Sequence, residues 1–178
     1  VARPGDRVAV LGLGGLGHLG VRFAVAMGFE TVSIARGPDK ADFAKQLGAH
    51  HYIDSTAGTG VAEALQSLGG VQVVLATAAN SEAIAATVDG LTPRGELVVI
   101  GIDPAPLQIA PLQLIMPAIL VHGHSNGTAQ DIEDTMAFSA LHGIRPVIET
   151  VPLAQADEAY QKMLSGAARF RMVLTTTG

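Results

Sequence analysis

Glycine fills five of the nine positions from Gly12 to Gly20, and this cluster constrains the fold more than any other feature of the chain. A glycine weakens a helix or a strand by about 0.5–1 kcal/mol relative to alanine, so the backbone here must need glycine for its conformation or for a close approach. An aliphatic run, Arg7–Leu11, precedes the cluster, and Leu16–Met27 follows with apolar residues on one helical face. The glycines therefore occupy a turn from a buried strand into a helix.

Three of these glycines, Gly12, Gly14 and Gly17, have the spacing G-x-G-x-x-G, and Gly15 and Leu16 complete the loop. Between a strand and a helix this spacing is typical of a dinucleotide-binding site. Gly12 would make the tight turn, Gly14 would admit the pyrophosphate, and Gly17 would let the helix pack on the strand. The free N–H groups that begin the helix would face the phosphates. A glycine-rich turn without a ligand is the alternative.

Short aliphatic runs and helical patterns alternate along the chain, which predicts an α/β fold with right-handed crossovers. The further strands are expected at Thr31–Ala35, His51–Asp54, Gln72–Ala76, Glu96–Gly101 and Ile119–His124, and the further helices at Asp39–Leu47, Val61–Leu68, Glu82–Asp89 and Gln130–Leu141. We expect a doubly wound, six-stranded parallel sheet of the Rossmann type in the order 3-2-1-4-5-6.

The pattern changes near the C-terminus. An extended piece leads into a helix that ends at Gly166, and a final strand at Phe170–Thr175 has no obvious partner in a complete six-stranded sheet. We therefore divide the chain into a cofactor-binding domain, residues 1–145, and a helix–strand return segment, residues 146–178.

Composition excludes several classes of protein. Eleven Lys and Arg against sixteen Asp and Glu give a net charge of −5, which argues against a nucleic-acid or membrane-surface partner. The chain has no cysteine, so it offers no disulfide, no thiolate nucleophile and no cysteine-ligated zinc. It shows no apolar stretch of membrane-spanning length and no signal-peptide pattern, and we expect a cytoplasmic location.

The end of the second expected strand bears on the choice of cofactor. NAD-binding domains place Asp or Glu there for the ribose hydroxyls, whereas this chain has Ala35 and Arg36. Asp39 falls beyond the turn, at an ordinary helix start. Arg36, Lys40 and the helix N-terminus would attract a 2′-phosphate, so NADP is favoured over NAD.

No catalytic residue and no metal ligand is predicted. His122 and His124 share one face of the sixth expected strand, but two imidazoles without a third ligand make a poor zinc site. His50 and His51 are neighbours in a strand and point to opposite faces. For His18, at the start of the first helix, a surface or packing role is favoured over catalysis.

The segments "GLGGLGHLGVRFAVAMG", "AKQLGAHHYID", "GELVVIG" and "MLSGAARFRMVL" resemble zinc-dependent alcohol dehydrogenases of the medium-chain dehydrogenase/reductase superfamily, in order and over essentially the whole chain. The resemblance implies the cofactor-binding half of an enzyme that passes hydride between an alcohol and its aldehyde or ketone. In that family the zinc ligands lie in a preceding catalytic domain. This chain alone is therefore expected to bind cofactor, to hold no zinc and to be inactive.

The resemblance also implies site residues and a partner. It assigns cofactor contacts to Gly12, Gly14, Gly15, Leu16, Gly17, Ala35, Lys40, Ala76, Thr77, Ile100, Gly101, Ile102, His124 and Arg171. Arg171 would pair with the pyrophosphate. The strand at residues 119–124 would join its copy in a homodimer. Two alternatives remain open: a zinc-free quinone or enoyl reductase of the same superfamily, and a non-catalytic nucleotide-sensing module.

Overall fold

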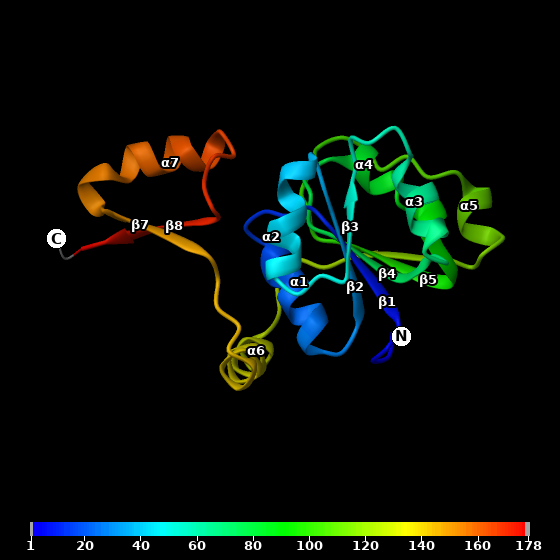
Figure 1. The fold of residues 1–178 in the computed structure, drawn as a ribbon, viewed down its shortest axis with the longest axis horizontal. Coiled ribbons are helices and arrows are strands. Elements are labelled where there is room, and N and C mark those ends of the chain that lie inside the picture. The colour runs from blue at the N-terminus through cyan, green and yellow to red at the C-terminus, as the bar shows by residue number, and fades with distance from the viewer. Residues whose placement is uncertain (1, 177–178) are drawn as a thin grey trace.

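A parallel sheet of six strands forms the body of the protein in the computed structural model, which describes residues 2–176. Its order, β3-β2-β1-β4-β5-β6, confirms the expected topology (Figure 1). The strands are β1 (Arg7–Leu11), β2 (Glu30–Ala35), β3 (His51–Asp54), β4 (Val71–Ala76), β5 (Leu91–Val99) and β6 (Leu120–Gly123).

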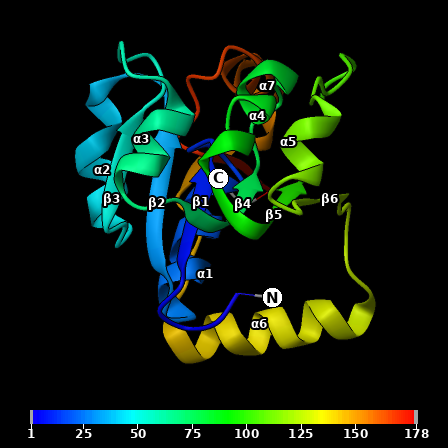
Figure 2. The same ribbon diagram turned by 90° about the vertical axis from the view of Figure 1, so that its right-hand side faces the viewer.

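Helices cover both faces of this sheet (Figure 2). The helices are α1 (Gly17–Ala26), η1 (Pro38–Lys40), α2 (Ala41–Gln46), α3 (Val61–Ser67), α4 (Ser81–Ala85), η2 (Val88–Gly90) and α5 (Pro111–Ile115), together with α6 (Ala129–His142), which packs beside α1. No described helix is long and apolar enough to span a membrane.

The two faces carry separate apolar cores, because successive side chains of a strand point to opposite sides. Val10 packs with Val21 of α1 and Ala44 of α2 on one face. Ala9 and Leu11, its neighbours in β1, join the larger core under α3 and α4 on the other face. Burial on both faces explains why these strands are continuous aliphatic runs.

The return segment forms its own small unit of β7 (Ile148–Pro152), η3 (Leu153–Gln155), α7 (Ala156–Leu164) and β8 (Arg171–Thr175). The final strand, which had no obvious partner, pairs in parallel with β7. The extended piece before the helix is thus a strand in its own right. Figure 1 shows this pair beside the six-stranded sheet, next to α1 and α2.

Several elements differ from expectation by more than a residue at an end. The helix expected at Asp39–Leu47 is formed by η1 and α2. β5 begins at Leu91, because Thr92–Gly95 stay in the strand despite their turn-forming composition, with a register shift opposite Val71/Val73. The helix expected at Glu82–Asp89 is split into α4 and η2. The short helix α5, which begins with Pro111, was not expected.

An ion network ties the amino ends of the first three strands together. Arg7 Nη2 donates to Glu30 Oε2 at 2.8 Å, and His51 Nε2 lies 2.6 Å from Glu30 Oε1. Arg7 also donates to the carbonyl oxygens of Leu68 and Gly70. The bonds from Arg7, and then from His51, lower the pKa of the Glu30 carboxyl.

Replacing Glu30 by glutamine is expected to lower the free energy of unfolding by about 1 kcal/mol near neutral pH, the range for a partly exposed charged pair. Because folding lowers the pKa of Glu30, its stabilisation is complete above the unfolded-state pKa and disappears as pH falls through the folded-state value. Urea unfolding from about pH 7 to about pH 3 should show the two curves converging in acid. Glu133→Gln, an exposed position within α6, is the control. An equal effect at every pH would contradict this account.

Candidate functional site

The glycine loop joins β1 to α1, and at two positions the backbone admits no side chain. Gly12 has φ +98°, and its N–H donates to Ile34 O at 2.8 Å. A β-carbon on Gly12 would lie 2.9 Å from Thr77 Oγ1, and one on Gly17 would lie 1.7 Å from Gly12 O. The tight turn and the close seating of α1 therefore both require glycine.

Gly14 and Gly15, which lie between these two positions, leave open space beside the loop. A β-carbon on Gly14 would meet no atom within 4 Å, and one on Gly15 would lie 3.4 Å from Nε of Arg171. Helix α1 begins after Leu16 with no side-chain cap and no acidic residue in its first turn. A helix N-terminus, open space and a guanidinium thus meet at one place, which suits an anion.

Thr77, directly after β4, forms hydrogen bonds to the start of this loop. Its N–H and its hydroxyl each donate to Leu11 O at 2.9 Å, and the hydroxyl also lies 3.3 Å from Gly12 O. Its hydroxyl is thus directed at the glycine loop.

The end of β5 lies equally close to the end of β4. The N–H groups of Ile100 and Gly101 both donate to Ala76 O at 2.9 Å. A β-carbon on Gly101 would lie 2.0 Å from Ala78 O, so only glycine fits there. Ile102 follows with 88% of its surface exposed. Ile100, Gly101 and Ile102 therefore lie at the carboxyl end of the sheet, between the end of β4 and β6.

At the other side of the loop, β2 ends without a carboxylate. Ala35 is buried, and Arg36 is exposed directly after it. The ammonium group of Lys40, expected to reach a ribose, donates instead to Arg36 O at 2.8 Å. The structure therefore brings Lys40 to the backbone of Arg36.

Two side chains of β3 hold the turn after Arg36, and sequence reasoning missed both. Asp54 Oδ1 accepts from the N–H of Gly37 at 2.8 Å, and Tyr52 donates its hydroxyl proton to Gly37 O at 2.5 Å. The hydroxyl and N–H of Thr56 also bond to Asp54 and, with Gly37, lower the pKa of its carboxyl. Oδ1 of Asp54 thus accepts three hydrogen bonds, one from Gly37 and two from Thr56.

Beyond β6, His124 donates its N–H to Val99 O at 3.0 Å and leaves its side chain exposed. His122 Nε2 lies 3.9 Å from Glu96 Oε2. Within residues 2–176, no three His, Cys, Asp or Glu side chains gather closely enough to hold a metal ion.

His18 is fully buried, so the packing role is right and the surface role is wrong. Its Nδ1 lies 2.8 Å from Gly14 O, and its Nε2 accepts from the N–H of Val147 at 3.1 Å. The ring also stacks on Phe170 with centroids 5.1 Å apart. Because Nε2 accepts, the proton must sit on Nδ1 and point at Gly14. Burial lowers the pKa of His18. The hydrogen bond to Gly14 raises this pKa, and the charges of Arg171 and Arg22 lower it further.

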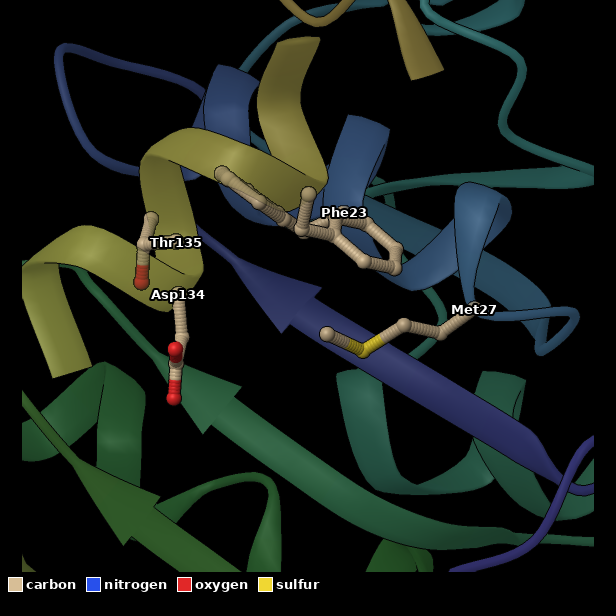
Figure 3. A pocket seen from close by; sticks show the side chains of 5 residues that line it. Phe23, Met27, Asp134 and Thr135 are labelled. Carbon is tan, nitrogen blue, oxygen red and sulfur yellow. The ribbon is translucent and has the colours of Figure 1, made fainter. Parts of the chain in front are cut away.

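A separate apolar hollow of about 370 Å³ lies between α1 and α6 (Figure 3). It is lined by Phe23, Met27, Asp134, Thr135 and Phe138. Its one ionisable lining group is a carboxylate, which would repel a phosphate. The glycine loop remains the candidate site.

A Rossmann sheet with a glycine loop at the carboxyl end of β1 is typical of a dinucleotide-binding domain. The sequence profile of the family described as zinc-binding dehydrogenase matches residues 15–141, and the chain belongs to this family. It is the cofactor-binding domain of the zinc-dependent alcohol dehydrogenase group.

Curated relatives agree with this assignment. The chain is 43% identical over 173 residues to the alcohol dehydrogenase notN of an Aspergillus species, covering 97% of this chain and 50% of that protein. It is 33% identical to an alcohol dehydrogenase of Geobacillus stearothermophilus, covering 97% and 51%. The chain thus spans about half the length of the curated relatives it matches.

Among solved structures, a cinnamyl alcohol dehydrogenase of Sorghum bicolor superimposes with a TM-score of 0.89 at 29% identity, over 99% of this chain and 49% of that one. An acetophenone reductase of Geotrichum candidum, solved in complex with NAD, shares the fold with a TM-score of 0.84 at 20% identity, over 98% and 49%.

Proposed function

We propose that the chain binds a nicotinamide dinucleotide across the carboxyl ends of its strands, with the pyrophosphate at the glycine loop. The observation that carries this proposal is the open face of Gly14, together with the Arg171 guanidinium at the neighbouring Gly15 and the uncapped start of α1. Backbone N–H groups and a guanidinium can share the two negative charges of a pyrophosphate. Thr77 and Gly17 would keep the loop in place.

We propose further that the cofactor is NADP(H) rather than NAD(H). An NAD site needs a free carboxylate at the end of β2, and Ala35 stands there. The nearby carboxylate of Asp54 belongs to β3, and its Oδ1 already accepts from Gly37 and Thr56. Exposed Arg36, with Lys40 next to its carbonyl group, offers positive charge to a 2′-phosphate.

Replacing Arg36 by alanine is expected to weaken NADPH binding by about 1.5–3 kcal/mol and to leave NADH binding nearly unchanged, because NADH lacks the 2′-phosphate. Calorimetric titration of both cofactors measures the difference. Lys45→Ala, which removes one exposed positive charge on α2, is the control for a general charge effect. Equal losses for the two cofactors, or equal affinities in the unmodified protein, would contradict a role of Arg36 in selectivity.

The nicotinamide end would lie against the ends of β5 and β6. Ile100, Gly101 and Ile102 would offer backbone groups to its carboxamide, with the backbone of His124 beyond them. When bound, the nicotinamide supplies hydride chemistry, and these residues would orient its ring.

The residues of this chain do not fit a catalytic zinc. The sequence has no cysteine, and the described part of the chain has no three-residue metal cluster. We propose that residues 1–145 form the cofactor domain and that residues 146–178 return toward a catalytic domain in a longer protein. That protein would transfer hydride between a small alcohol and its aldehyde or ketone, as the names of its relatives suggest.

A further inference from the structure

The two hydrogen bonds of His18 connect parts of the chain that are 129 residues apart. One bond reaches the glycine loop at Gly14 O, and the other reaches Val147, just before β7. The ring is fully buried, and its stacking on Phe170 restricts its orientation. A neutral imidazole with one donor and one acceptor nitrogen satisfies both partners at once.

Val147 also bonds to the start of β8, the strand that contains Arg171. Its carbonyl oxygen accepts from the N–H groups of Phe170 at 3.1 Å and of Arg171 at 3.2 Å. The side chain of Arg171 then comes back to Gly15, the residue after Gly14. The path from Gly14 through His18 and Val147 therefore leads to Arg171, whose Nε lies 3.4 Å from where a β-carbon on Gly15 would stand.

We propose that His18 is a positioning residue that holds the Arg171 guanidinium over the glycine loop, an inference that rests on the proposed binding of a dinucleotide at that loop. Arg171 lies on an exposed strand of the small sheet, and its own side chain is exposed. The hydrogen bonds of His18 and Val147 fix the backbone of Arg171 relative to the glycine loop, so binding of the pyrophosphate has to order only the side chain of Arg171 and not its strand.

The test is a double-mutant cycle on NADPH affinity, measured by calorimetry on the purified protein. Arg171→Ala is expected to weaken binding about ten- to hundredfold. His18→Asn keeps an amide donor near Gly14 but loses the acceptor for Val147, and it should weaken binding about tenfold. In the double variant the His18 change should add almost nothing, because the guanidinium it positions is gone.

Two further variants separate positioning from simple packing. His18→Gln places an amide oxygen near the original Nε2, so it should restore NADPH affinity to within about threefold of the unmodified protein. His142→Asn makes the same chemical change on the exposed end of α6 and should have no effect. Additive losses in the cycle, or no rescue by glutamine, would overturn the role of His18.

Hydrogen exchange on the unmodified protein tests the same path if a His18 variant fails to fold. The amide proton of Val147 should be protected, and saturation with NADPH should protect it further. Unchanged exchange at Val147 on saturation would overturn the proposal. Failure of the unmodified protein to bind NADPH at all would instead overturn the proposed function.

Discussion

Replacing Gly17 by alanine is expected to lower the free energy of unfolding by about 3 kcal/mol or more, at the upper end of the cost of overpacking. The new β-carbon would lie 1.7 Å from Gly12 O and 2.9 Å from Thr77 Oγ1. The first obstacle is backbone, which cannot rotate away, so α1 would have to move off β1. Urea unfolding followed by circular dichroism measures the loss.

Gly14→Ala is the matched control in the same loop. Its β-carbon would meet no atom within 4 Å, so the free energy of unfolding should change by less than about 0.5 kcal/mol. Equal destabilisation by the two substitutions would show that the loop tolerates no side chain anywhere and would contradict the distinction drawn between these glycines.

Replacing Val121 by proline is expected to convert a homodimer into a monomer. β6 is the last strand of the sheet, and Leu120 in it and Ile115 and Met116 just before it are exposed. An apolar edge of this kind pairs readily with another strand. We propose that β6 pairs with β6 of a second copy across a two-fold axis. A substitution in β6 then changes both strands of the interface.

The direction of the backbone bonds makes this substitution selective. His124 donates its N–H to Val99 O, and since directions alternate along a strand, the N–H of Val121 points away from β5. Proline at this position should spare the internal ladder and raise the dimer dissociation constant about a hundredfold or more. Val121→Thr keeps the donor and is the control. A monomer of the unmodified protein in sedimentation at high concentration would refute the dimer.

The aliphatic strands were predictable because burial on both faces leaves little choice of residue. β1 and β3 have the expected bounds, and β2, β4 and β6 differ by one residue at one or both ends. The start of β5 was missed because Pro93 and Gly95 normally interrupt strands, and here the strand continues through them with a register shift. Tertiary pairing outweighs local propensity at such positions.

In the candidate site, too, some features were predictable from the sequence and others were not. The glycine spacing predicts the loop, because each glycine answers a local steric demand. Two hydrogen bonds, between His18 and Val147 and between Gly37 and Asp54, join residues that are far apart in the sequence. No local sequence pattern predicts such bonds. For His18 the only sequence signal was a histidine directly after the last glycine of the motif. The placement of Arg171 came from the family resemblance.

Calorimetric titration of the protein with NADPH, repeated on Gly14→Ala, tests the central claim most directly. We expect saturable binding of one cofactor per chain to the unmodified protein. In Gly14→Ala, whose fold should be intact, a methyl group would stand where the pyrophosphate lies, and affinity should fall about tenfold or more, at least 1.4 kcal/mol. Absence of saturable binding, or equal affinity in the two proteins, would contradict a dinucleotide site at the glycine loop.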